Sequence, residues 1–289
     1  MVRIIKFSLL GLLLFLSSCL REQTYREHIQ SVDSFSPAFP LLMSCSSKTF
    51  ITFDVDDTLI TARDVIARDF RSPLIFKFLT LLKYPELLKK DRFEWAASIV
   101  FAQAERYVFD PQVVKIIRHL QQQECNVLGL TSIETGSFGT IPNMSAWRAH
   151  KLKALGIDFQ RKFADATLTS LPSHRGNYPQ LYQGILCTNQ QPKGKVLGAF
   201  LDYYHLNPEK IISFDDNQKD LVSIARECAQ RNIRFIGFHY KGAEKIVGVW
   251  LDQWNTKRAL KQVDVLMQEG HWMSDKDYAR MLENMGTIH

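Results

Sequence analysis

The chain has 289 residues, of which 46% are apolar and 23% are charged, and these values exclude extensive disorder. This length suffices for one sizeable α/β domain with an insertion, or for two small domains. The formal net charge is +6, and the lysines and arginines are scattered, without a basic stripe interleaved with aromatic residues. We therefore expect some preference for anionic ligands and no nucleic-acid partner.

The first eighteen residues have the pattern of a secretory signal peptide. A positively charged start precedes an apolar run at 7–16, which is too short to cross a bilayer as a helix, and Leu-Ser-Ser-Cys follows at 16–19. This tetrapeptide resembles the lipobox of bacterial lipoproteins. The resemblance implies removal of residues 1–18, lipidation of Cys19, and an exported protein anchored in the bacterial cell envelope, facing the periplasm or the exterior. A plain signal peptide cleaved nearby is the alternative.

Residues 19–47 are largely polar and lack a clear periodicity, and they are predicted to tether the anchor to the domain. A strand is predicted at 49–53, where apolar and β-favouring residues precede Asp54. Two further carboxylates, Asp56 and Asp57, follow within three residues. Such a group repels itself and loses hydration in a packed turn, so a packing role is disfavoured and a bound Mg²⁺ is favoured.

The segment 61–109 interrupts the pattern of the rest of the chain. It contains aromatic-rich stretches of helical pattern at 76–82 and 93–107. We expect this segment to form a helical cap over the site. A packing insertion that does not contact the substrate is the alternative.

Helices and strands alternate after this segment. Helices are predicted at 110–123, 145–155, 195–205 and 218–231, and strands at 126–130, 180–188, 211–214 and 233–238. The alternation predicts a Rossmann-like α/β core at 48–240, a parallel sheet with helices on both faces. Residues 241–289 are predicted to form amphipathic helices that cover this core.

Polar residues stand where these elements end or begin. They are Thr131, the neighbouring lysines Lys193 and Lys195, and the acidic residues Asp215, Asp216 and Asp220. In a parallel α/β sheet the ligand site lies beyond the carboxyl ends of the strands. We therefore expect these residues to meet the aspartates that follow the first strand.

In this order, the residues resemble the motifs of the haloacid-dehalogenase-like (HAD) phosphatase superfamily, whose first motif is Asp-x-Asp-x-Thr after an apolar strand. The resemblance implies that Asp54 is the nucleophile and Asp56 the general acid/base. It also implies that both belong to a Mg²⁺ site and that Thr58 orders the loop. More narrowly, the whole chain resembles an uncharacterised bacterial family of exported HAD-like lipoproteins, a resemblance that implies no substrate.

The same resemblance assigns roles to the next two motifs. Thr131 would hydrogen-bond a phosphoryl oxygen, and a lysine would neutralise charge on the phosphoryl group. The superfamily's frequent Lys-Gly-x-x-Leu arrangement favours Lys193, with Lys195 as the alternative.

The last motif is the acidic group that follows the strand at 211–214. Aligned with the superfamily's Gly-Asp-x-x-x-Asp form, it places Asp216 at the metal and Asp220 beside it. Asp215 stands where glycine is usual, so which of Asp215 and Asp216 binds the metal stays open at this point.

The sequence thus predicts a Mg²⁺-dependent phosphomonoesterase that acts through an aspartyl-phosphate on a small phosphorylated metabolite. By resemblance, aspartate rather than threonine at position 56 disfavours a transport ATPase or a dehalogenase. One alternative is an exported lipoprotein that kept the fold as a binding or interaction module without turnover. Another is a phosphomutase, for which an exported location has no obvious supply of bisphosphate intermediates. No protein partner is indicated.

Other candidates have ordinary structural explanations. Arg175 in a predicted hairpin tip at 174–177 and His239 after the last strand could reach the site, but a solvated turn and a structural histidine are favoured. The aromatic residues Trp95, Phe101 and Tyr107 have helical spacing that is more typical of a core.

Four cysteines remain besides Cys19, and they are Cys45, Cys125, Cys187 and Cys228. They form no C-x-x-C motif and have no metal-binding spacing. An oxidising compartment permits a disulfide, but Cys125 and Cys228 lie in segments predicted to be core, which favours buried free thiols.

Overall fold

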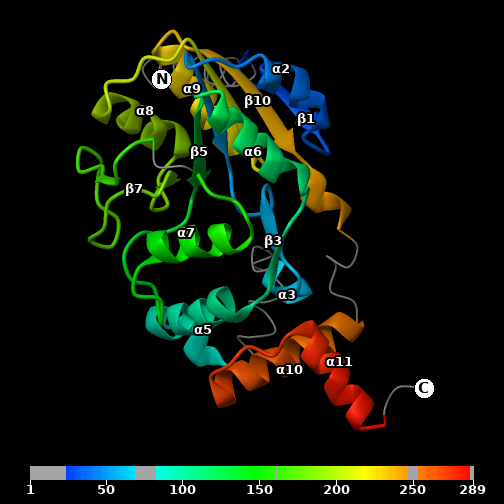
Figure 1. The fold of residues 1–289 in the computed structure, drawn as a ribbon. Helices are drawn as coiled ribbons and strands as arrows, with labels where there is room; N and C mark the ends of the chain where they lie inside the picture. Colours follow the sequence, from blue (N-terminus) through cyan, green and yellow to red (C-terminus); the bar gives the residue numbers. More distant parts are fainter. Residues whose placement is uncertain (1–23, 69–82, 160–161, 247–252, 287–289) are drawn as a thin grey trace, which may run out of the picture.

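The computed structural model describes residues 24–68, 83–159, 162–246 and 253–286 (Figure 1). The predicted signal peptide with Cys19, and the predicted helix at 76–82, lie outside these residues. Among the described helices, none is both long enough and apolar enough to cross a membrane.

The described chain has an α/β fold around an eight-stranded, mostly parallel sheet of order β1-β10-β9-β2-β5-β8-β7-β6. The strands are β1 (Ile29–Val32), β2 (Thr49–Phe53), β5 (Asn126–Thr131), β6 (Ala166–Thr167), β7 (Gln180–Tyr182), β8 (Ile185–Cys187), β9 (Lys210–Asp215) and β10 (Arg234–Tyr240). Neighbours from β1 to β8 in this order are parallel, so their carboxyl ends meet at one edge. The predicted parallel α/β class is confirmed.

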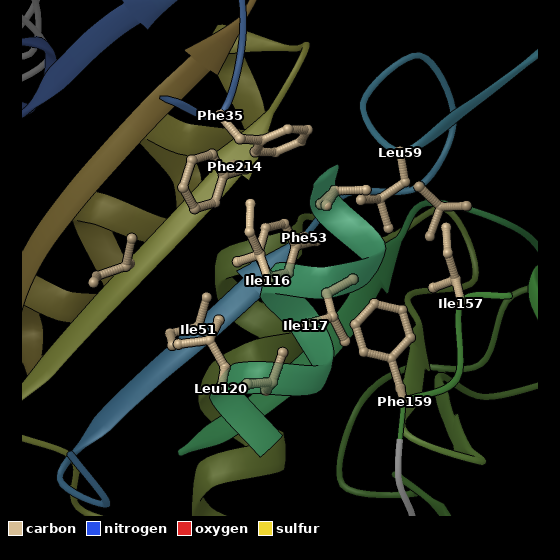
Figure 2. Packing of buried hydrophobic residues seen from close by; sticks show 14 of the residues in the cluster. Phe35, Ile51, Phe53, Leu59, Ile116, Ile117, Leu120, Ile157, Phe159 and Phe214 are labelled. Atoms are coloured by element: carbon tan, nitrogen blue, oxygen red, sulfur yellow. The ribbon is translucent and has the colours of Figure 1, made fainter. Parts of the chain in front are cut away.

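Helices cover both faces of this sheet. They are α2 (Phe39–Met43), α6 (Gln112–Gln122), α7 (Met144–Ala154), α8 (Lys193–Tyr203) and α9 (Gln218–Gln230). Because successive side chains of a strand point to opposite faces, β2 contributes to two apolar clusters. Ile51 and Phe53 pack with α2, α6 and α7 (Figure 2). Phe50 packs on the opposite face, where the cluster contains side chains of α8 and α9.

The segment 19–47 differs from the predicted tether, because residues 29–43 belong to the core. β1 pairs in parallel with β10 at the edge of the sheet. Phe35 is fully buried, with its ring centroid 5.3 Å from that of Phe214 and 4.8 Å from that of Tyr240. The apolar residues of this segment are too sparse to form a periodic pattern, but Val32, Phe35, Ala38 and Leu42 are buried in the core.

The predicted strand at 180–188 is two antiparallel strands, β7 and β8. Gln183 and Gly184 join them with positive φ angles of 49° and 76°, the backbone of a two-residue hairpin turn. A Cβ atom at position 184 would lie 2.4 Å from the carbonyl oxygen of Phe159, so this turn requires glycine. A short apolar run does not reveal such a reversal.

An insertion follows β2 and leads the chain away from the sheet before α6. It begins and ends in the antiparallel pair β3 (Ile60–Ala62) and β4 (Arg106–Val108), and it includes α3 (Val65–Arg68), η3 (Pro85–Leu88) and α5 (Lys90–Gln103). The predicted helical stretch at 93–107 therefore ends early, because the chain must return beside β3. Tyr107 is a strand residue.

The C-terminal helices α10 (Gln253–Glu269) and α11 (Asp275–Asn284) differ from their predicted position, since they pack on the insertion and not on the sheet's core (Figure 1). One apolar cluster contains residues of both segments: Ile66, Leu87, Ala96, Ile99, Val100 and Ala104 from the insertion, and Ala259, Val263, Leu266 and Trp272 from the C-terminal segment. The two ends of this cluster are far apart in sequence, so helix amphipathicity identifies the buried faces but not their partners.

A buried carboxylate, Asp64, ties the two segments together. Its Oδ2 accepts a hydrogen bond from Trp272 Nε1 at 2.7 Å, and its Oδ1 accepts one from the backbone N–H of Asp275 at 2.9 Å. Asp64 is 3% exposed, and this burial raises the pKa of its carboxyl above the ordinary range. The two donors offset part of the cost of burying the carboxylate.

Replacement of Trp272 by Phe tests this connection. The substitution keeps an aromatic ring but removes the donor to Asp64, and we expect the free energy of unfolding to fall by about 1–3 kcal/mol. Chemical denaturation measures the change. Tyr203→Phe, at a residue that is 55% exposed, is the control and should change the free energy of unfolding by less than about 0.5 kcal/mol. Equal effects of the two substitutions would contradict the role of Asp64.

Candidate functional site

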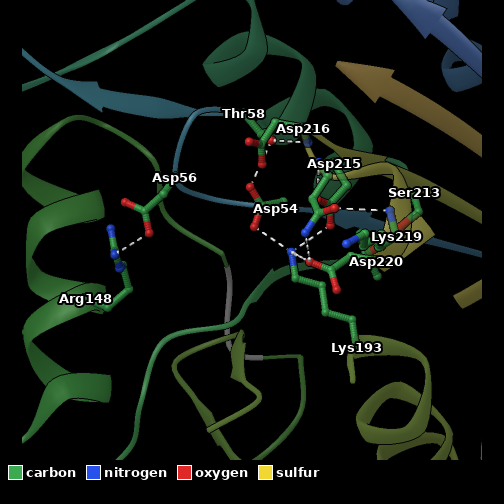
Figure 3. A network of polar contacts seen from close by, with 12 residues as sticks. Asp54, Asp56, Thr58, Arg148, Lys193, Ser213, Asp215, Asp216, Lys219 and Asp220 are labelled. Atoms are coloured by element: carbon green, nitrogen blue, oxygen red, sulfur yellow. Dashed lines mark hydrogen bonds and ion pairs between the residues drawn. The ribbon is translucent and has the colours of Figure 1, made fainter. Parts of the chain in front are cut away.

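Four neighbouring strands, β9, β2, β5 and β8, bring the polar residues of the sequence motifs to one edge of the sheet. Asp54 follows β2, Thr131 ends β5, and Asp215 ends β9. Lys193 begins α8, the helix after β8. Because these strands are parallel neighbours, residues more than 150 positions apart in sequence become adjacent side chains (Figure 3).

The loop after β2 is held by backbone and hydroxyl contacts. The backbone N–H of Asp54 donates to Phe214 O at 2.8 Å, which fixes the end of β2 beside β9. The hydroxyl of Thr58 donates to Asp54 Oδ2 at 2.9 Å and accepts from the backbone N–H of Asp216 at 3.0 Å. Thr58 therefore couples the first and last motifs directly, which gives its predicted loop-ordering position a geometric basis.

Lys193 is the centre of the charged contacts. Its Nζ lies 2.6 Å from Asp54 Oδ1, 2.6 Å from Asp215 Oδ2 and 3.7 Å from Asp220 Oδ2. The side chain is 1% exposed, whereas Lys195 is exposed. Of the two lysines that the sequence left open, the structure places Lys193 in the site.

The position of Lys193 depends on the glycine that follows it. A Cβ atom on Gly194 would lie 2.0 Å from the carbonyl oxygen of Ser223, and the Gly194 N–H donates to the Ser223 hydroxyl at 3.1 Å. Glycine thus lets the first turn of α8 lie directly against α9. This close approach aims the lysine at the carboxyl ends of the strands.

The site carries more negative than positive charge. Burial by itself would lower the pKa of Lys193, but Asp215 and Asp54 outweigh it and raise that pKa, so the ammonium stays charged. Burial raises the pKa of Asp215 to about 7, against the opposing effect of Lys193. One ammonium thus faces three carboxylates, and a further cation would stabilise their ionised forms.

Three carboxylates could hold such a cation. Ligand atoms of Asp54, Asp215 and Asp216 all lie within 4.8 Å of one another. Oxygen donors at this spacing suit a hard divalent ion. The geometry brings both of the aspartates that the sequence left open, Asp215 and Asp216, within reach of one ion.

The carboxylate of Asp56 does not belong to that group. Its Oδ2 lies 2.6 Å from Arg148 Nη2, on the side of Asp54 opposite to Lys193 (Figure 3). The side chain of Asp56 is therefore not at the predicted metal-binding position with Asp54, Asp215 and Asp216. Asp57 has a positive φ of 61° and accepts a hydrogen bond from the Thr61 hydroxyl at 2.9 Å, which turns the chain into β3.

A cavity of about 840 Å³ opens onto these residues. Asp54, Asp56, Thr131, Lys193, Asp216 and Asp220 line it on the sheet side. The insertion lines the other side, with Phe93, Phe101 and Arg106 among its residues. The volume is that of a small-molecule site, and the aspartates lie in its wall.

The weaker candidates divide between the cavity and the scaffold. Arg175 lies in the predicted hairpin tip, which the backbone hydrogen bonds between His174 and Asn177 confirm, and it lines the cavity. It forms ion pairs with Glu94 of α5 and with Glu134, and these connect α5 to the core. His239 Nε2 contacts the backbone oxygen of Asp216 at 3.0 Å, a structural role. Phe101 lines the cavity.

Sequence reasoning missed Arg148 and Arg106. Arg148 lies in the middle of α7 and Arg106 begins β4, far from every recognised motif. Scattered arginines carry no signal of their own in a chain with 36 lysines and arginines. The four cysteines Cys45, Cys125, Cys187 and Cys228 are free thiols, and the last three are buried.

The chain belongs to a family of proteins of unknown function, DUF2608, whose model matches residues 31–278. The matched range includes the sheet, the insertion and most of the C-terminal helices. All of the site residues described above lie within it.

Three relatives illustrate the range of similarity. An uncharacterized protein of Rickettsia prowazekii is 26% identical over 242 residues, which cover 84% of this chain and 86% of the relative. A second uncharacterized protein of that organism is 29% identical over 43% of this chain and 44% of its own length. A Chlamydia trachomatis protein described as "Putative outer membrane protein" is 30% identical over 32% of this chain and 34% of its own length.

The buried ion-pair cluster makes a prediction about stability. Lys193→Met should lower the free energy of unfolding by about 3–5 kcal/mol, because it leaves Asp54 and Asp215 buried without their shared counter-charge. Lys195→Met, an exposed position on the same helix, is the matched control and should cost less than about 0.5 kcal/mol.

The cost of Lys193→Met should also depend on pH. In the folded state the pKa of Asp215 is raised to about 7, above its unfolded value of about 4, so a neutral carboxyl forms as the pH falls. The destabilisation should therefore be smaller at pH 5 than at pH 8. Urea unfolding at both pH values measures it, and a loss that grows towards low pH would contradict the arrangement.

Proposed function

We propose that this protein is a Mg²⁺-dependent phosphomonoesterase of the HAD-like superfamily that hydrolyses a small phosphorylated metabolite. The observation that carries the proposal is the buried contact of Asp54 with Lys193, at the carboxyl end of β2, beside two further aspartates that could share a cation with Asp54. The order and spacing of the motifs support it, as does a cavity of small-molecule size.

In this proposal Asp54 is the nucleophile. A carboxylate oxygen attacks the phosphorus atom, the bond from phosphorus to the leaving oxygen breaks, and an aspartyl-phosphate forms. Asp56 donates a proton to the leaving oxygen and then accepts one from the water that attacks the intermediate. This second attack releases phosphate and regenerates the Asp54 carboxylate.

The remaining motif residues bind the phosphoryl group. Lys193 supplies a fixed positive charge, and Thr131 supplies a hydroxyl at the end of β5. A divalent cation held by Asp54, Asp215 and Asp216 would neutralise charge on the phosphoryl oxygens when bound. Thr58 keeps Asp54 oriented through its 2.9 Å hydrogen bond.

The insertion corresponds in this proposal to the cap of the superfamily. Support comes from Phe93, Phe101 and Arg106, which line the cavity opposite the aspartates. Residues 48–240 would then be the core with this cap, and the C-terminal helices would support the cap.

We also propose an envelope location with a lipid anchor at Cys19. The Leu-Ser-Ser-Cys sequence at 16–19 supports it, as does the description of the chlamydial relative as an outer membrane protein candidate. When the protein is produced in a bacterium that processes lipoproteins, intact mass should show acyl chains on Cys19. Cys19→Ala should abolish them, and an unacylated wild-type protein would contradict the anchor.

The decisive test of the activity is hydrolysis of a panel of phosphomonoesters with Mg²⁺. Wild type should release phosphate, and Asp54→Asn should lose at least about 10³-fold in kcat because it lacks the nucleophile. Asp158→Asn, whose side chain is 61% exposed, is the matched control and should keep wild-type activity. Activity that survives Asp54→Asn would contradict the proposal, and binding of the panel compounds without turnover would favour an interaction module.

The metal site can be tested without turnover. Mg²⁺ at a concentration of about 100 times its Kd should raise the free energy of unfolding of the wild type by about 2.7 kcal/mol, because the ion binds only the folded site. Asp216→Asn should reduce this increase strongly, whereas Asp158→Asn should preserve it. Thermal unfolding measures both, and equal stabilisation of the two variants would place the ion elsewhere.

A further inference from the structure

Besides Arg175, which pairs with Glu94 and Glu134, three arginines line the cavity, and the proposed reaction uses none of them. Arg68 ends α3, Arg106 begins β4, and Arg148 lies in α7, so two come from the insertion and one from the core. The wall also carries acidic side chains, so the contacts of each guanidinium decide whether its donors are satisfied.

Arg148 is the most deeply buried of the three, at 3% exposure. Its Nη2 pairs with Asp56 Oδ2 at 2.6 Å, but its Nε and Nη1 are buried and have no hydrogen-bond partner among the described residues. Its guanidinium carbon lies 4.9 Å from the ring centroid of Trp147. A guanidinium presents five N–H donors, so a single carboxylate leaves most of this buried group unsatisfied.

Arg106 lies close to Arg148, and its guanidinium carbon is 5.5 Å from the same Trp147 ring. Its Nη1 donates to the carbonyl oxygen of Phe101 at 2.9 Å. Burial, followed by the charge of Arg148, lowers the pKa of Arg106 to about 10, and the nearby Asp56 and Asp57 oppose this shift. The two like charges are thus held together at a cost.

Arg68 repeats the pattern of Arg148. Its Nε donates to the carbonyl oxygen of Ala62 at 2.6 Å, and its Nη2 donates to that of Arg63. Its Nη1 is buried without a hydrogen-bond partner among the described residues. The arginines of the cavity wall therefore include guanidinium donors that the described part of the chain does not use.

These donors lie on one defined side of the site. Asp54 stands between Lys193 on one side and Asp56 with Arg148 on the other (Figure 3). In the proposed reaction Asp56 protonates the leaving oxygen, so a group that contacts Asp56 faces the leaving group and not the phosphoryl group being transferred. Lys193 and a cation serve the phosphoryl group, which leaves the arginines to serve the rest of the substrate.

We propose that the substrate's leaving group carries a second anionic group, a carboxylate or another phosphate, which binds Arg106 and Arg148. This inference rests on the proposed phosphomonoesterase activity and names its substrate class. The anion supplies the acceptor that the Arg148 Nε and Nη1 lack and offsets the repulsion between the two guanidinium groups. Arg68 is the third donor on the same wall.

The test compares matched substrates with wild-type protein and Mg²⁺. 3-Phosphoglycerate and glycerol 3-phosphate differ by a carboxylate in place of a hydroxymethyl group, and fructose 1,6-bisphosphate and fructose 1-phosphate differ by one phosphate. In at least one pair we expect kcat/KM to be about 10- to 100-fold higher for the compound with the second anion. The pair that shows the preference identifies the anion as a carboxylate or a phosphate.

Variants assign the preference to the arginine pair. Arg106→Gln should reduce the ratio of kcat/KM values within the preferred pair by about tenfold, mainly through a higher KM for the doubly anionic compound. Arg148→Lys should reduce the same ratio, because an ammonium keeps the charge but lacks the planar fork. Arg118→Gln, at an exposed residue of α6, removes one positive charge elsewhere and should leave the ratio unchanged.

Two outcomes separate this inference from the proposed function. Hydrolysis of all four compounds with equal kcat/KM would overturn the inference and leave the phosphomonoesterase standing. If neither these compounds nor the wider panel of phosphomonoesters is hydrolysed, the proposed activity fails, and calorimetric titration of Asp54→Asn with the same pairs decides the inference. Tighter binding of the doubly anionic compound supports it, whereas equal or absent binding overturns it, and the comparison does not require Arg106→Gln to fold.

Discussion

The buried contact of Lys193 with Asp54 and Asp215 is the constraint on which the rest of the site depends. An ammonium and two carboxylates are enclosed at the carboxyl edge of the sheet, each at most 5% exposed. Burying these charges is costly, and the cost is offset because each finds an opposite charge at 2.6 Å. The contact forms only when β9, β2 and α8 are correctly placed relative to one another. The charged groups of the site therefore depend on the correct assembly of the sheet.

The backbone around this contact is arranged to maintain it. Thr58 joins the loop after β2 to the start of the acidic motif through two hydrogen bonds. Gly194 allows α8 to approach α9 closely enough for the lysine to reach the aspartates. Neither residue carries charge, but each limits where the charged groups can move. A preorganised arrangement of this kind is what an electrostatically driven reaction needs.

A second layer is built on the insertion. Its helices supply one wall of the cavity, and the C-terminal helices pack on it through an apolar cluster and through Asp64. The position of Arg106 in the cavity thus depends on residues more than 150 positions further along the chain. The family match covers the insertion together with the sheet.

The sequence by itself determined the parallel α/β class and most of its elements. Apolar strands with alternating helices have few packing solutions, and the carboxyl ends of parallel strands must meet at one edge. That rule predicts that Asp54 and Thr131 lie close to one of the two lysines, Lys193 or Lys195, and to the acidic group at 215–220. Local chemistry also marked the hairpin tip at 174–177 and the ends of α7 and α9.

The tertiary structure alone decided everything that depends on partners far apart in the chain. It placed 29–43 in the core, split 180–188 into two strands, and moved the C-terminal helices onto the insertion. It chose Lys193 over Lys195, turned Asp56 towards Arg148, and gathered the arginines. An apolar face or a single charge is visible in a sequence, but the surface that meets it is set by long-range packing, which no local pattern encodes.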